Sequence, residues 1–225
     1  MILDLHIHSK YSFDSFSEID NIMLVARRKG LNGIAITDHN TIRGGIEAEK
    51  INKDADFLVI VGCEISTEIG DVIGLFLNEE IKSRYSKEVF EEIHRQGGIV
   101  VLPHPYKGHK LSDEIMKNID AVEGFNSRTS EEDNKKAMKL AEQYKKHVIA
   151  GSDAHFYREI GASRVIVNSK DVKNEILNGR LKLETTKTPL YMESLSQMIK
   201  SIKLGKYVDI PIQFMWFIRN VLERK

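Results

Sequence analysis

Residues 1–8 read Met1-Ile-Leu-Asp-Leu-His-Ile-His8, a short apolar stretch that ends in a His-x-His pair. The apolar and β-branched residues predict a β-strand that begins almost at the first residue. In a strand, residues i and i+2 point to the same face, so His6 and His8 are directed at one spot at its carboxyl end. Two adjacent imidazoles are half of a transition-metal site, but buried histidines also occur as hydrogen-bonded core residues. The interpretation depends on whether other strands send ligands to the same spot.

The same scheme, an apolar strand that ends in polar side chains, recurs along the chain. Further strands are expected at 33–39, 55–64, 71–77, 99–105, 120–126, 147–155 and 164–168, and helices at 17–29, 41–51, 85–96, 130–146 and 169–179. This alternation predicts parallel pairing, with the ligand site at the carboxyl ends of the strands. A closed or nearly closed barrel brings these ends to one rim, whereas an open sheet spreads them along a line. We therefore expect an α/β barrel.

Eight side chains at or near the expected strand ends are candidate metal ligands: His6, His8, Asp14, His39, Glu64, His104, Asp153 and His155. All of them except Asp14 and His39 are also candidate catalytic residues. Imidazoles mixed with carboxylates suit Zn, Mn or Fe better than Ca or Mg alone. Eight ligands exceed the capacity of one ion, so two to three divalent ions are expected, with a carboxylate such as Glu64 as a bridge. Such a cluster clamps phosphoryl oxygens and lowers the pKa of a coordinated water to make hydroxide, which predicts phosphoester hydrolysis.

The composition narrows the choice of partner and compartment. The 225 residues hold 33 basic and 33 acidic side chains, a balance that argues against binding of long nucleic acids on a broad basic face. The one cysteine, Cys63, suits a reducing compartment. The sequence shows neither a signal peptide nor an apolar run of the roughly 20 residues that a transmembrane helix needs. We expect a cytoplasmic protein without a transmembrane segment.

Ordered motifs along the chain resemble one known family. They are Asp4-Leu-His-Ile-His8-Ser, Ile36-Thr-Asp-His39, Gly62-Cys-Glu64, His104-Pro105, Val122-Glu-Gly-Phe-Asn126 and Gly151-Ser-Asp153-Ala-His155. Together they look like those of the polymerase and histidinol phosphatase (PHP) family of metal-dependent phosphoesterases. The resemblance implies a distorted TIM-like (β/α)7 barrel, which we place at residues 1–186.

The resemblance also implies how the ligands are divided among the ions. The first ion would take His6, His8, Glu64 and Asp153; the second would share Glu64 and add His104; the third would take Asp14, His39 and His155. Related trinuclear members supply a further histidine from the loop after their Glu-x-x-Asn strand. The corresponding segment, residues 126–131, contains none. We therefore expect the second ion to be bound more weakly, or to be completed by Asn126 or water.

Residues 187–225 are expected to form a helical extension. Leu195, Met198, Ile199 and Ile202 follow the i, i+3, i+4, i+7 spacing of an amphipathic helix, and an apolar segment at 214–218 follows. Packing on the barrel itself is the first expectation for this extension. A homodimer contact or a helix at a membrane surface is the alternative.

The expected substrate is a small phosphomonoester, such as a nucleotide, a nucleoside bisphosphate or a sugar phosphate. Candidate substrate contacts are Asn126, Arg128, Lys107 and His109. The alternatives are histidinol-phosphate phosphatase activity, a 3′-5′ or 5′-3′ exonuclease on short oligonucleotides, and a catalytically silent binding module. An amidohydrolase also uses His-x-His on a barrel rim, but the presence of Glu64, where that class usually has a bridging lysine, favours phosphoester chemistry.

Overall fold

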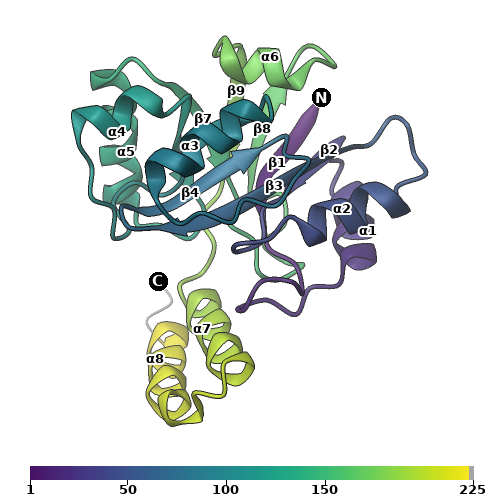
Figure 1. Cartoon of the computed structure of the whole chain (residues 1–225). Coiled ribbons are helices and arrows are strands. Elements are labelled where there is room, and N and C mark those ends of the chain that lie inside the picture. Colours follow the sequence, from purple (N-terminus) through teal and green to yellow (C-terminus); the bar gives the residue numbers. More distant parts are fainter. Residues whose placement is uncertain (223–225) are drawn as a thin grey trace.

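The computed structural model describes residues 1–222 and shows an α/β barrel with a pair of helices below it (Figure 1). One nine-stranded sheet has the order β7-β6-β5-β4-β3-β2-β1-β8-β9. Its strands are β1 (Ile2–Ile7), β2 (Gly33–Ile36), β3 (Leu58–Thr67), β4 (Gly70–Leu75), β5 (Ile99–Leu102), β6 (Ala121–Asn126), β7 (His147–Gly151), β8 (Ser163–Val167) and β9 (Leu181–Thr185). The helices are α1 (Ile19–Arg28), α2 (Arg43–Ile51), α3 (Ser86–Arg95), α4 (Asp113–Asn118), α5 (Glu131–Gln143), α6 (Val172–Leu177), α7 (Tyr191–Lys203) and α8 (Ile210–Leu222).

The sheet is nearly closed, which confirms the expected barrel. Its end strand β7 comes back to β1, where Ala154, just after β7, bridges to Ile7 of β1. There the His8 amide donates to the Ala154 carbonyl at 2.8 Å, and the Ala154 amide donates to the His6 carbonyl at 3.2 Å. This closure joins the first and last ligand-bearing strands at their carboxyl ends.

The prediction of parallel pairing throughout is wrong. β1–β2–β3 and β5–β6–β7 are parallel, but β4 runs antiparallel to both β3 and β5 because a short turn joins it to β3. β8 is antiparallel to β1, and β9, a strand that the sequence did not predict, is antiparallel to β8. The sequence did not predict β9 because it is a short edge strand whose side chains are all partly or fully exposed. The short helix α4 was also not expected.

Three apolar clusters hold the layers together. Leu3, Leu5 and Ile60 belong to the cluster inside the barrel. A second cluster packs α1 and α2 against the outside of the sheet, and a third does the same for α3, α4 and α5. Figure 1 shows these helices around the barrel wall, so they leave uncovered the barrel end at which β1 terminates.

A register shift in β1 sets the direction of the His-x-His pair. The pairing with β2 shifts between Asp4 and Ile7. Before the shift, Leu3 and Leu5 pack inside the barrel; after it, Ile7 packs outside against α1. His6 and His8, which alternate with Ile7, therefore face the interior at the rim.

Helices α7 and α8 form an antiparallel hairpin that projects from the barrel at the end where β1 terminates (Figure 1). α8 leaves large apolar side chains exposed, among them Phe214, Met215 and Trp216, the last 65% exposed. A groove of about 560 Å³ lies between the two helices and is lined by Leu190, Ile212 and Trp216, among others. Contiguous exposed apolar surface of this kind is typical of an interaction site.

The homodimer that the sequence suggests through this extension stays a prediction, and α8 gives it a test. If a second copy covers the exposed face, Trp216→Glu should shift the mass measured by light scattering from dimer to monomer, because the charge could not be buried in the interface. Ile46→Glu, at an exposed apolar residue of α2, is the control and should leave the mass unchanged. A monomeric wild-type protein at high micromolar concentration would contradict the prediction.

In the part of the chain that the structure describes, residues 1–222, each helix is too short or too polar to cross a bilayer.

Candidate metal centre

The eight candidate ligands meet at one end of the barrel. They come from β1 and the loop after it, from the segment after β2, from β3, and from the segments after β5 and β7. His39 is partly exposed and the rest are buried. Their nitrogen and oxygen atoms form overlapping groups within which all ligand atoms lie within 4.8 Å of one another. Their role as ligands stays a prediction, but the structure places them where such a role requires.

The Glu64 carboxylate lies at the centre of this arrangement. Its Oε2 is 3.4 Å from His6 Nε2 and 3.2 Å from His8 Nε2. The same oxygen is 3.4 Å from His39 Nδ1, and Oε1 is 2.9 Å from His104 Nε2. A carboxylate with two oxygens facing different imidazoles has the geometry of a bridge between two ions.

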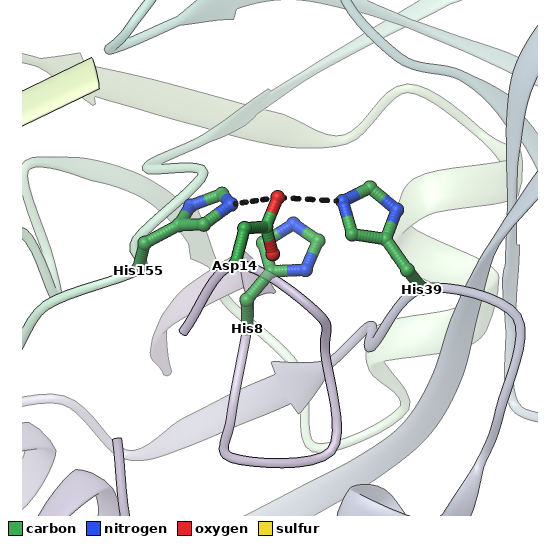
Figure 2. Close-up of side chains that lie close together, drawn as sticks. All are labelled: His8, Asp14, His39 and His155. Atoms are coloured by element: carbon green, nitrogen blue, oxygen red, sulfur yellow. Dashed lines mark ion pairs between the residues drawn. The ribbon is translucent and has the colours of Figure 1, made fainter. Parts of the chain in front are cut away.

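A second carboxylate, that of Asp14, lies between two further imidazoles of the centre (Figure 2). Its Oδ2 lies 3.1 Å from His155 Nε2 and 3.2 Å from His39 Nε2. His8 lies behind the carboxylate and completes this group of three imidazoles and one acid. These are the residues expected to hold the third ion, with His8 in addition.

Hydrogen bonds to the far side of three rings orient them toward the cavity. His6 Nδ1 is 3.0 Å from Glu123 Oε1, and His8 Nδ1 is 3.0 Å from Ser12 Oγ. His155 Nδ1 is 2.8 Å from the Asp153 carbonyl. Metal-ligating histidines use their second nitrogen in this way, which fixes the ring and, for His6 and His8, also the tautomer. Glu123 is a residue whose supporting role the sequence did not predict.

Two of the residues at strand ends have strained backbones. His104 and Asp153 have φ angles of 27° and 53°, in the left-handed region that residues with a side chain rarely adopt. Such strain is found mostly at functional sites, where the surrounding structure compensates for it. Here the His104 amide donates to Glu123 Oε2 at 3.0 Å, and this bond helps to hold the strained turn.

The charges of the cluster strongly perturb its pKa values. Burial alone lowers the pKa of His8, but hydrogen bonds to Asp153 and Glu64 raise it to about 10. Burial raises the pKa of Glu64, yet the charges of His39 and His6 bring it well below its usual range. Burial and the neighbouring Arg128 lower the pKa of His155 to about 4. Buried acids and imidazoles that perturb each other to this degree mark a functional site.

Unpaired buried atoms test whether these residues fit a metal. Among the described residues, Asp14 Oδ1 and His104 Nδ1 are buried without a hydrogen-bond partner. Buried polar atoms rarely stay unpaired in native proteins unless an ion or water satisfies them. Imidazole and carboxylate donors are also the set that transition metals prefer. The residues therefore fit a cluster of divalent ions.

Asp71 is a candidate ligand that the sequence analysis missed. It lies on β4 and pairs with Ser66 of β3, and its carboxylate groups with Glu64 and His104. These are the two residues expected to hold the second ion, for which no histidine follows β6 in the sequence. The antiparallel course of β4 brings Asp71 to this side, and an assumption of parallel strands could not reveal it.

Asp71→Asn should therefore lower the affinity for the second ion and leave the group around Asp14 loaded. Loss of one carboxylate ligand typically weakens a metal site by tenfold or more, by comparison with the 10- to 100-fold effects of outer-shell partners. Elemental analysis after dialysis against limiting Mn should show about one ion fewer per chain than in wild type. The control is Asp56→Asn, at an exposed acid far from the centre. Equal metal content in Asp71→Asn and wild type would exclude Asp71 as a ligand.

The four expected substrate contacts have different environments. Asn126 is fully buried and its amide donates to Glu123 Oε2 at 2.9 Å, so it helps to hold the Glu123 carboxylate in place. His109 shares a hydrogen bond of 2.7 Å with the Asp71 carbonyl. Lys107 is exposed at the cavity and pairs with Glu193 of α7 at 3.2 Å. Their contact with a substrate stays a prediction.

Arg128, the fourth of these residues, connects the barrel with α7. Its guanidinium is buried, donates to the Met192 carbonyl at 3.0 Å and to Ser196 Oγ at 2.6 Å, and lies 3.4 Å from Glu159 Oε1. It also contacts His155 Nδ1. These contacts fix α7 over the centre, and they leave little of the guanidinium free for a ligand.

α7 covers a cavity of about 270 Å³ whose floor is the ligand cluster. The barrel contributes Phe13, Ser66 and Lys107 to its wall, in addition to candidate ligands. A volume of this size accommodates a phosphoryl group with a small leaving group.

Sequence comparison identifies the family to which this site belongs. Residues 4–210 match the PHP domain. The chain belongs to the PHP family. It is 33% identical to the uncharacterized protein MJ0417 of Methanocaldococcus jannaschii over 244 residues, which cover 98% of each chain. It is 46% identical to MJ1587 of the same organism over 141 residues, 56% of this chain and 82% of that protein. A shorter match, 30% over 79 residues, joins it to a probable histidinol-phosphatase of Thermotoga maritima and covers 32% of this chain and 34% of that protein.

Solved structures share the PHP fold of this chain. A two-domain Bacteroides vulgatus protein, which contains a predicted PHP-like metal-dependent phosphoesterase, matches with a TM-score of 0.69 at 19% identity, over 83% of this chain and 65% of that one. A putative metal-dependent phosphoesterase of Bifidobacterium adolescentis matches with a TM-score of 0.61 at 18% identity, over 79% and 96%. At this identity the likeness shows the fold alone.

Proposed function

We propose that this PHP protein is a metal-dependent phosphoesterase that hydrolyses a small phosphomonoester, such as a nucleotide, a nucleoside bisphosphate or a sugar phosphate. The observation that carries the proposal is the position of the Glu64 carboxylate among four imidazoles at the floor of a covered cavity of about 270 Å³. Membership of the PHP family and the name of the Thermotoga relative support phosphoester chemistry. The covered cavity supports a small substrate.

The cluster would hold two to three divalent ions, with Mn, Zn or Fe as the fitting metals. His6, His8, Glu64 and Asp153 would hold the first ion. Glu64 and His104, together with Asp71, would hold the second. Asp14, His39 and His155 would hold the third. When bound, such ions neutralise charge on phosphoryl oxygens and lower the pKa of coordinated water.

The protein's own residues orient this chemistry and limit access to it. Glu123 and Ser12 hold the rings of His6 and His8 through their Nδ1 atoms, so that both Nε2 atoms point into the cavity. α7 lies over the cluster, and Gln197 and Lys200 of its inner face line the cavity beside it.

A comparison of monoesters with diesters tests the proposal. Phosphate release should be measured with nucleotides, nucleoside bisphosphates, histidinol phosphate and sugar phosphates, beside bis-p-nitrophenyl phosphate and a five-nucleotide oligomer. We expect turnover of one monoester class to exceed that of both diesters, since the cavity beside the cluster is small. Faster cleavage of the oligomer would overturn the proposal and favour the exonuclease alternative, and a preference for histidinol phosphate would identify the histidinol-phosphatase branch.

A further inference from the structure

The inner face of α7 is polar and lies over the metal centre. Glu193, Ser196, Gln197 and Lys200 all line the cavity. Their spacing of i, i+3, i+4 and i+7 places them on one face of the helix. Helix α7 lies outside the (β/α) series of the barrel, so this face adds side chains that the barrel strands do not supply.

Three lysines lie near this cavity, and two of them are already engaged. Lys107 pairs with Glu193 at 3.2 Å. Lys203 donates to three backbone carbonyls of the loop 10–15 at 2.6–2.8 Å, and so holds the end of α7 on the loop after β1. Both ammonium groups have structural partners.

Lys200 differs from these two lysines. Within residues 1–222, no carboxylate lies within ion-pair distance of its ammonium group. Its Nζ lies instead 4.7 Å from the centroid of the Phe13 ring. A cation over an aromatic face is attracted less strongly than a cation beside an anion. The ammonium is therefore available to an anion that enters the cavity.

The aromatic contact also places Lys200 beside the predicted ligands. Phe13 stacks on His39, with ring centroids 4.3 Å apart and planes at 6°. His39 in turn lies 3.2 Å from Asp14 in the third-ion group. Lys200, Phe13 and His39 thus form a continuous stack from α7 down to the cluster. Lys200 also lines the same cavity as Asp14, His39 and His155, so its side chain borders the space that an anion held at this group would occupy.

We propose that Lys200 is a substrate-binding residue, whose ammonium donates to a non-bridging oxygen of the phosphoryl group held at the cluster. The inference rests on the proposed function for the identity of that group. It makes α7 part of the active site and not only its cover. The ligand class is a phosphoryl dianion on a small leaving group, for which inorganic phosphate is the simplest probe.

Binding of inorganic phosphate to the full-length, Mn-loaded protein tests the inference without turnover. Calorimetric titration should show that Lys200→Gln raises the phosphate Kd by roughly 10- to 100-fold, the effect of one lost charged hydrogen bond. Lys200→Arg should recover most of the affinity. Lys206→Gln removes the same charge from an exposed site on the same hairpin and should leave the Kd unchanged. All three variants should carry the wild-type metal content.

The outcomes separate this inference from the proposed function. A Lys200→Gln protein that binds phosphate within twofold of wild type overturns the inference, even if wild type hydrolyses monoesters. Wild-type protein that binds no phosphate when loaded with Mn also overturns it. If phosphate binding depends on Lys200 but no monoester is hydrolysed, the inference stands and the proposed function fails.

Discussion

Glu64→Gln should lower the metal content and abolish turnover with almost no change in side-chain shape. The amide cannot supply the negative charge that faces His6 and His8 on one oxygen and His104 on the other. We expect at least one ion fewer per chain by elemental analysis. The fall in kcat should exceed the roughly 10- to 100-fold that loss of an outer-shell partner produces, because Glu64 contacts the predicted ligands directly.

The control for this variant is Glu79→Gln, which makes the same change of charge at an exposed residue. It should keep wild-type metal content and kcat. Glu64→Gln with wild-type metal content and full activity would show that the carboxylate does not bridge, and the division of ligands proposed above would be wrong.

Arg128→Met should cause the largest loss of stability among the substitutions considered. Methionine replaces the apolar stem of the side chain but has no guanidinium, so it leaves Glu159 buried without its cation and removes both bonds to α7. Removal of one partner of a buried ion pair costs about 3–5 kcal/mol. Urea unfolding of metal-free protein should show this loss in the free energy of unfolding. Limited proteolysis should cut the variant first near residues 187–190.

The matched control is Arg158→Met, at an exposed arginine next to Glu159 in sequence. Its free energy of unfolding should stay within about 0.5 kcal/mol of wild type, as is usual for surface substitutions. If Arg128→Met costs less than about 1 kcal/mol and α7 resists protease as in wild type, Arg128 does not fasten the helix.

The barrel and the meeting of the eight side chains follow from local sequence features. Apolar strands that end in polar residues recur along the chain, and a closed sheet brings such ends together. The His-x-His pair shows this most directly, because residues i and i+2 share a face whatever the register of the strand. The register shift that turns His6 and His8 to the interior could not be predicted, since it arises from pairing with β2.

Features that depend on long-range packing were missed for the same reason. Asp71 reaches the cluster only because β4 runs antiparallel between β3 and β5. The cover formed by α7 depends on Arg128 and Lys203, whose partners are distant in sequence and include backbone carbonyls. The apolar spacing of α7 predicts a helix, but it does not reveal which surface its polar face covers.

Metal dependence of turnover is tested most directly by phosphate release from one small phosphomonoester before and after chelation. The wild-type protein should release phosphate in the presence of Mn, stop when EDTA is added, and resume when Mn is restored in excess. This result would tie turnover to the ions that the cluster is proposed to hold. Undiminished phosphate release by protein that elemental analysis shows to be free of metal would contradict the proposal that turnover depends on metal ions held by the cluster.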